Sequence, residues 1–231
     1  MVDRIDSKMT TLPPLWMSRI VASSPNISNH EEIRKLLGEP IPRAADISKL
    51  KPEIAAMFMS GGVLERIRSK LGTLTRKKGK KLVPAHNTVA CVDDEDTLYV
   101  GVEFLEQFGH DESLLAGILA HEWGHMMSDL PRDVDWNRLT WDQLFEIRRE
   151  EESFADGFAG RAVFLMGYAV EPMMEFLEKL EKKRNPKLPT LKYHNLATRK
   201  AILKESYAAA SRATEMARKL FFRTWQFINQ G

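Results

Sequence analysis

An apolar segment with three ionisable side chains at its centre constrains this chain more than any other feature. Residues 114–130 read LLAGILAHEWGHMMSDL, and such a run is typical of a buried helix. His121, Glu122 and His125 interrupt it. Burying polar groups without partners costs roughly 2 kcal/mol or more for each group. A helix of this kind therefore needs a partner for all three side chains.

The spacing of the two histidines predicts that this partner is a metal ion. Residues four apart lie one turn apart on one face of a helix, so the imidazoles of His121 and His125 converge. The pattern H-E-x-x-H on a helix is typical of zinc hydrolases, in which the histidines bind the metal and the glutamate, here Glu122, takes the proton of a metal-bound water. The alternative is a pair of hydrogen-bonded core histidines without a metal.

A catalytic zinc requires a third protein ligand and keeps its fourth position for water. A histidine six residues after His125 is excluded as this ligand, because Pro131 occupies that position. The segment 149–162, REEESFADGFAGRA, offers Glu152, and its alanines would let the second helix approach the first closely. Asp156, one turn after Glu152, is predicted to accept a hydrogen bond from the outer nitrogen of a ligating histidine and to fix its tautomer.

The charged residues that precede this third ligand have a plainer interpretation. Glu150 and Glu151 are predicted to form a solvated acidic face that pairs with Arg148 and Arg149. Glu152 would belong to the same face if it bound no metal.

The sequence as a whole predicts an α+β fold that is mostly helical, in two parts. Residues 1–45 form an N-terminal extension with one short helix, HEEIRKLLG, and residues 46–231 form one domain. Within the domain, two short helices over 46–72 precede a small antiparallel sheet, which is predicted over residues 75–105. Four further helices are predicted at about 111–129, 141–166, 171–183 and 195–229, the last being a long C-terminal helix.

Composition and charge exclude several classes of protein. The single cysteine, Cys91, excludes an internal disulfide framework, and the first thirty residues lack the pattern of a secretory signal, so we expect a cytoplasmic protein. No run approaches the roughly 18 apolar residues of a transmembrane segment. A formal net charge of +2 gives no reason to expect a nucleic-acid partner. Peripheral contact of the basic final helix with a membrane remains open, as does the oligomeric state.

The two motifs together resemble the gluzincin metallopeptidases of the HtpX-like and CAAX-prenyl-protease-like family. That family couples H-E-x-x-H to a downstream E-x-x-A-D, and this chain has HEWGH at 121–125 and ESFAD at 152–156. The resemblance extends in weaker form over about residues 85–205. It implies a zincin-like catalytic domain, in which a small antiparallel sheet lies beside the H-E-x-x-H helix and a second helix supplies a ligand. It also implies one Zn²⁺ per chain, held by His121, His125 and Glu152, and a peptide or protein substrate.

A late segment extends the resemblance. YHNLATRKAIL, 193–203, is similar to a family segment with a histidine and an arginine, and this similarity implies that His194 and Arg199 stabilise the oxyanion formed during peptide hydrolysis. In the family a proline usually follows the histidine and the arginine lies six residues on, whereas here Asn195 follows His194 and Arg199 lies five on. The alternative for His194 is a surface or capping residue at the start of the final helix.

The hairpin NTVACVDDEDTLYVG, 87–101, resembles the family hairpin whose edge strand lies beside the active site. Extended peptides commonly bind by adding a strand to such an edge. Asn87, Val89 and Cys91 are therefore expected to bind substrate. The alternative is an ordinary structural strand, in which Cys91 is a small buried apolar residue.

We therefore expect a zinc-dependent endopeptidase in which Glu122 acts first as general base and then as general acid. One alternative is a regulatory metallopeptidase similar to the ImmA/IrrE group, which cuts a repressor and has a phenylalanine–alanine pair comparable to Phe158 and Ala159. Another is a non-catalytic, zinc-stabilised interaction protein whose basic final helix contacts a partner. Four protein ligands would indicate the last, since hydrolysis needs an open position on the metal.

Overall fold

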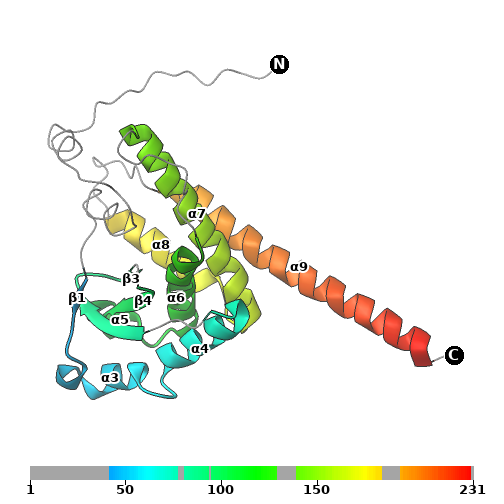
Figure 1. The fold of residues 1–231 in the computed structure, drawn as a ribbon, viewed down its shortest axis with the longest axis horizontal. Coiled ribbons are helices and arrows are strands. Elements are labelled where there is room, and N and C mark those ends of the chain that lie inside the picture. The colour runs from blue at the N-terminus through cyan, green and yellow to red at the C-terminus, as the bar shows by residue number, and fades with distance from the viewer. Residues whose placement is uncertain (1–41, 78–80, 94, 129–138, 184–192, 230–231) are drawn as a thin grey trace.

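The structure is a computed structural model that describes residues 42–77, 81–93, 95–128, 139–183 and 193–229, the last nine of these by their backbone alone. Helices and one small sheet make up this part of the chain (Figure 1), which confirms the predicted, mostly helical α+β architecture. The helix predicted at 30–38, and nearly all of the extension 1–45, lie outside the described residues.

Four short strands form the sheet, namely β1 (Arg43–Ala44), β2 (Lys81–His86), β3 (Ala90–Val92) and β4 (Thr97–Gly101). Their order is β1-β2-β4-β3, so β1 and β3 are the edges. The predicted antiparallel sheet is wrong at its centre, because β2 and β4 run parallel while the two outer pairs are antiparallel. After β2 the chain leaves the adjacent position in the sheet empty and forms β3 at the edge. It then returns as β4, which lies between β2 and β3. Alternating residues predict strands, but they carry no information on this order.

The helices follow the predicted segments closely. The four long ones begin and end within two residues of their predicted bounds, and the two short ones near the start of the domain are confirmed. The short helix at 102–108 is not predicted, since its first residues continue the alternation of β4. The helices are α3 (Pro52–Phe58), α4 (Val63–Thr75), α5 (Val102–Phe108), α6 (Glu112–Met127), α7 (Trp141–Met166), α8 (Glu171–Lys183) and α9 (Leu196–Asn229), with a 3₁₀ turn at Ile47–Lys49.

Capping residues explain where α6 begins and where α7 begins and ends. The Asp111 carboxylate accepts a hydrogen bond from Leu114 N at 2.9 Å, so Asp111 is the N-cap of α6 as predicted. Thr140 and Gln143 form a reciprocal capping box at the start of α7. Gly167, with a φ of 82°, ends α7 in the left-handed conformation that glycine adopts at little cost.

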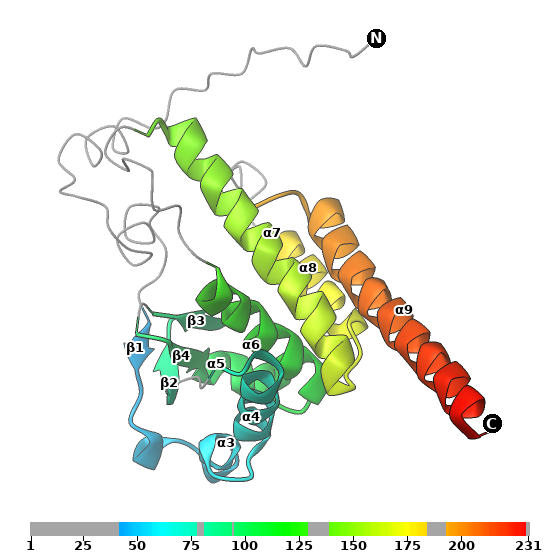
Figure 2. The same ribbon diagram turned by 45° about the vertical axis from the view of Figure 1, so that its right-hand side comes forward.

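α6 occupies the centre of the molecule, which explains why its sequence is apolar on every side. It contacts α4, α7, α8 and β3, and Figures 1 and 2 show it between the sheet and α7. Trp123 is fully buried, and its Nε1 donates a hydrogen bond to Thr75 Oγ1 at 3.1 Å. A helix enclosed in this way has little water to solvate its polar side chains, so His121 and His125 need partners inside the protein.

α7 lies between α6 and α9, and glycines allow close contact on both sides. A Cβ at Gly124 would lie 2.7 Å from Ala155 Cα, and one at Gly160 would lie 2.3 Å from Leu203 O. The alanines predicted to permit this approach, Ala155, Ala159 and Ala162, are buried.

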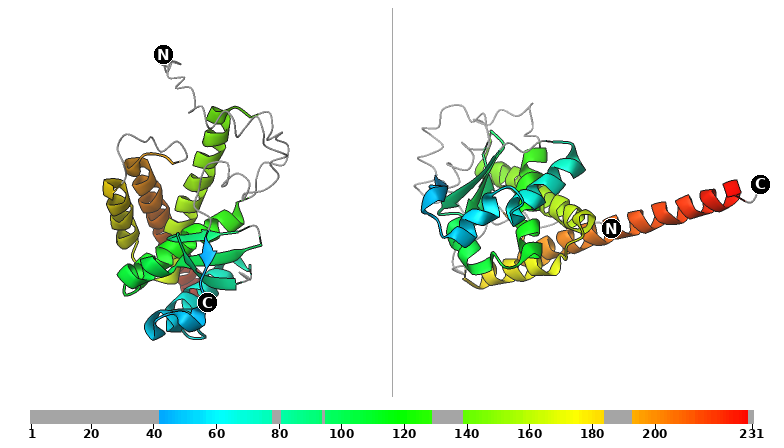
Figure 3. Two further views of the ribbon diagram at one scale, coloured as in Figure 1. Left: turned by 90° about the vertical axis from the view of Figure 1, so that its left-hand side faces the viewer. Right: turned by 90° about the horizontal axis from the view of Figure 1, so that it is seen from below.

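The last turns of α9 extend beyond the other elements (Figure 3). None of the helices in the described part of the chain combines the length and the apolar character that a membrane crossing requires.

Candidate metal centre

His121 and His125 of α6 and Glu152 of α7 form a buried group that can hold a metal ion. One ligand atom from each residue lies within 4.8 Å of the other two. The two Nε2 atoms are 3.3 Å apart, and Glu152 Oε2 lies 3.2 Å from His121 Nε2. The other carboxylate oxygen lies 3.7 Å from His125 Nε2. The structure thus brings together the three residues that the sequence predicted as ligands.

The close approach of α6 and α7 positions this group. Gly124 lies between the histidines in the sequence, and the absence of a Cβ there allows Ala155 of α7 to sit against the α6 backbone. Glu152, one turn before Ala155, is then level with the imidazoles, and Asp156 follows one turn later on the same face. The four-residue spacing on both helices therefore produces two facing pairs of polar side chains.

Asp156 and Arg199 support the outer nitrogen of His121. Asp156 Oδ1 lies 3.0 Å from His121 Nδ1, an ion-pair distance, although Nδ1 has no well-aligned hydrogen bond. Asp156 is fully buried and accepts two hydrogen bonds from Arg199, from Nε at 2.7 Å and from the terminal NH2 group at 2.8 Å. This two-point contact fixes the carboxylate, and the carboxylate in turn faces the ring that carries Nε2.

Glu151 and Arg148 support His125 in the same way, which corrects the prediction that Glu151 lies on a solvated face. Glu151 is only 6% exposed, and its Oε1 lies 3.2 Å from His125 Nδ1 in a hydrogen bond. Arg148, 4% exposed, pairs with Glu151 and also with Glu152 Oε1 at 2.9 Å. Glu150 is exposed, as predicted.

Glu151 is buried because neighbouring elements cover a broad face of α7. That face includes Arg148, Glu151 and Ala155, which succeed one another at spacings of three and four residues. Three consecutive glutamates look like one acidic patch in the sequence. The signal that distinguishes Glu151 is its position three residues after an arginine and four before a buried alanine.

The carboxylates set the protonation of the group. Burial lowers the pKa of His121, but Asp156 and Glu152 outweigh burial and raise it to about 10. Burial raises the pKa of Glu152, and the charges of Arg148 and His125 more than offset this, so the pKa lies well below its usual range. The pKa of Asp156 is also lowered, since Arg199 and His121 outweigh the effect of burial. The Glu152 carboxylate is therefore held in its ionised form.

Charge and hydrogen bonding both indicate that the group fits a cation. The buried carboxylates Glu151, Glu152 and Asp156 outnumber the guanidiniums Arg148 and Arg199 by one, so the cluster is negative when the histidines are neutral. Glu152 Oε2 is buried and finds no hydrogen-bond donor among the described residues. A cation between the imidazoles would occupy this oxygen and, in place of the proton on His121, would balance the charge of the third carboxylate.

Glu122 lies between the two histidines in the sequence and is half-buried, whereas His121, Trp123 and His125 are buried. It is therefore the ionisable side chain of this turn that retains contact with solvent, as a group that exchanges protons must.

His194 and Arg199 differ in their relation to the centre. His194 is half-buried just before α9, and the contacts known for the described residues do not join it to the ligands. The N-cap of α9 is Asn195, whose side chain accepts from Thr198 N at 2.9 Å, so a capping role for His194 is wrong. Arg199 reaches the centre through Asp156, and its guanidinium also lies 4.7 Å from the Tyr193 ring.

The edge strand β3 lies beside the helix that carries the histidines, because α6 packs against it. Of the three residues expected to bind substrate, only Cys91 is in this strand. Asn87 occupies a turn with a φ of 66°, and Val89 precedes the strand, accepting a hydrogen bond from Gly101 N at 2.8 Å. The strand is short because the 87–89 segment turns closely over Gly101, where a Cβ would lie 1.9 Å from Thr88 O.

Comparisons with protein-family models, with characterised proteins and with solved structures find no match to this chain. In the absence of a match, the buried group of His121, His125 and Glu152 is the feature of the described chain that indicates a function.

Proposed function

We propose that this protein is a zinc-dependent endopeptidase of the HtpX-like and CAAX-prenyl-protease-like kind. The observation that carries the proposal is the buried group of His121, His125 and Glu152, with one carboxylate oxygen that lacks a hydrogen-bond donor among the described residues. Two imidazoles and one carboxylate are a ligand set of catalytic zinc. When bound, zinc would polarise the substrate carbonyl and acidify a water molecule.

Side chains of this protein would carry out proton transfer, orientation of the histidines and alignment of the substrate. Glu122, the partly exposed member of the turn, accepts the proton of the attacking water and delivers it to the departing amine. Asp156 and Glu151 keep the outer nitrogens of the two histidines protonated, so that the Nε2 lone pairs face the metal position. The edge of β3 aligns an extended peptide through backbone hydrogen bonds. His194 is proposed to stabilise the oxyanion.

The number of ligands supports hydrolysis over a purely structural role. Within the described residues, the metal group contains three ligand side chains. Structural zinc is almost always bound by four protein ligands, whereas catalytic zinc keeps one position for water. The three side chains of this group therefore agree with a hydrolytic metal site better than with a purely structural one.

Metal analysis combined with peptide cleavage tests this proposal. Purified protein should contain one zinc per chain and cleave a mixture of peptides, and Glu122→Gln should retain the zinc while losing nearly all cleavage. Glu150→Gln, which changes an exposed glutamate of α7, is the matched control and should leave both unchanged. Protein without bound zinc, or a Glu122→Gln variant that cleaves normally, would overturn the proposal.

A further inference from the structure

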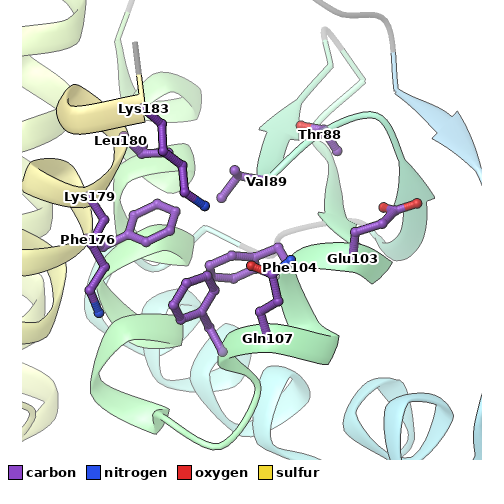
Figure 4. Close-up of a pocket in the computed structure, with 10 residues that line it drawn as sticks. Thr88, Val89, Glu103, Phe104, Gln107, Phe176, Lys179, Leu180 and Lys183 are labelled. Carbon is purple, nitrogen blue, oxygen red and sulfur yellow. The ribbon is translucent and has the colours of Figure 1, made fainter.

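A pocket of about 200 Å³ lies between α5, α8 and the turn that leads into β3 (Figure 4). Its floor consists of Phe104, Phe108 and Phe176, and Val89 and Leu180 form its walls. The three rings pack against one another with centroids 5.3 to 5.5 Å apart. Because Phe104 and Phe176 are buried in the core, the floor is rigid and its shape is preformed.

The rim of the pocket carries positive charge. Lys179 and Lys183 line it, and Figure 4 shows the Lys183 amine directed toward Val89 across the opening. Neither lysine forms an ion pair with another described residue, and the Lys179 amine lies 5.6 Å from the centroid of the Phe108 ring. The acidic residue of the rim, Glu103, is already held by His86, whose Nδ1 lies 2.6 Å from its carboxylate. An apolar cavity with two lysines at its mouth is complementary to an apolar group that has a negative charge next to it.

The pocket lies next to β3 and α8, and both of these elements pack against α6. Val89 directly precedes the edge strand β3, which packs on α6. On the other side, Met173 of α8 contacts α6 at Gly117, one turn before His121. A peptide added to the edge of β3 would pass Val89, a residue that lines the pocket, so that one of its side chains could enter the pocket.

We propose that this pocket selects the substrate, by binding a bulky apolar side chain that is followed or preceded by an acidic residue. The inference rests on the proposed peptidase function and adds the class of peptide that the enzyme cleaves. The aromatic floor binds the apolar side chain, and the lysines of the rim bind the neighbouring carboxylate. Peptides with an alanine in place of the bulky residue, or a lysine in place of the acid, are poor substrates.

Cleavage of a peptide library by the zinc-loaded protein tests the inference. The wild type should prefer leucine, methionine or phenylalanine beside aspartate or glutamate within about three residues of the cut. Lys183→Glu should lower kcat/KM for the acidic peptides by about tenfold or more and favour basic neighbours instead. Lys182→Glu changes an exposed lysine of the same helix that does not line the pocket, so it is the matched control and should change the preference little. Leu180→Trp, at a partly exposed wall, should shift the preference toward small side chains.

A binding measurement separates failure of this inference from failure of the proposed function. Glu122→Gln protein is titrated with a fluorescent peptide that contains leucine and aspartate, and Lys183→Glu in the same background should weaken binding by about tenfold. Cleavage without the stated preference, or binding that Lys183→Glu leaves unchanged, would overturn the pocket's role and leave the peptidase intact. Absence of cleavage together with binding that depends on Lys183 would overturn the peptidase function alone.

Discussion

At the scale of single residues, the centre consists of two parallel sets of contacts. Each ligand histidine meets a buried carboxylate at its outer nitrogen, and each carboxylate is held by an arginine. The sets are His121–Asp156–Arg199 and His125–Glu151–Arg148. Such contacts fix the tautomer and orientation of a metal-binding imidazole before the metal arrives. They explain why α6 and α7 bury so much charge.

Glu151 should matter to metal affinity although it binds no metal. Glu151→Gln removes the charge that faces His125 Nδ1 while keeping the size of the side chain. We expect zinc affinity to fall by about 10-fold to 100-fold, measured by competition with a chelator of known affinity. Glu150→Gln, one residue earlier and exposed, should bind zinc as the wild type does. Equal affinities in the two variants would contradict the role given to Glu151.

Metal affinity should rise with pH because a proton occupies the site. The pKa of His121 is raised to about 10, so in the metal-free protein its imidazole is charged at neutral pH and must lose a proton when the metal binds. Apparent zinc affinity should therefore increase by about tenfold per pH unit between pH 7 and 9. Calorimetry in buffers of different ionisation enthalpy should detect release of about one proton at pH 7. A pH-independent affinity over this range would be incompatible with a protonated His121.

The same raised pKa affects the stability of the metal-free fold. A group whose pKa is higher in the folded chain stabilises that fold fully below its ordinary pKa of 6.5, and this contribution disappears as the pH rises through about 10. Bound zinc would replace the proton and remove this dependence.

At the scale of helices, the distance between α6 and α7 determines the geometry of the centre. Gly124 and Ala155 set that distance, since a Cβ at Gly124 would lie 2.7 Å from Ala155 Cα and 3.2 Å from its Cβ. The ligand residues lie directly beside this contact. A small separation of the helices would therefore move Glu152 away from both imidazoles.

Gly124→Ala should for this reason weaken both stability and zinc binding. We expect the free energy of unfolding to fall by about 1–3 kcal/mol in urea titrations, with a parallel loss of zinc affinity. Gly157→Ala is the control on α7, because a Cβ there meets side chains of α9 at 3.4 Å or more. Its stability should be unchanged or slightly higher, since alanine favours a helix more than glycine does. Equal effects of the two substitutions would show that the α6–α7 contact is not critical.

At the scale of the whole molecule, the candidate ligands His121, His125 and Glu152 come from helices that pack in two different parts of the structure. α6 lies against the sheet and α4, while α7 packs with α9 on the other side (Figure 2). A ligand that binds only the folded chain stabilises it in proportion to the logarithm of its concentration.

Zinc should therefore stabilise the whole fold. At a free concentration about 100 times its Kd, zinc should add about 2.7 kcal/mol to the free energy of unfolding and raise Tm by several degrees. Glu152→Gln should lose most of this increase, which thermal melts with and without a chelator would measure. An increase that survives the substitution would place the stabilising ion elsewhere.

Much of this architecture was predictable from the sequence, and the exceptions have physical causes. The sequence predicts α6 to α9, because α6 is an apolar run that begins after the capping residue Asp111 and the other three helices have apolar residues at helical spacing. Local patterns do not encode the sheet order, which depends on contacts between distant segments. The two four-residue spacings predict the facing side chains of the ligand group. Glu151 is buried because the packed face of α7 is broad enough to include it. The breadth of that face depends on tertiary packing, which the sequence alone does not specify.

Locating a bound metal ion would decide whether His121, His125 and Glu152 hold it. Crystals grown with zinc should be measured at the zinc absorption edge, where anomalous differences locate the ion. We expect one peak at about 2.0–2.2 Å from His121 Nε2, His125 Nε2 and a Glu152 oxygen, with a water in the fourth position. A peak held by four protein ligands, or zinc bound only elsewhere on the chain, would contradict this expectation.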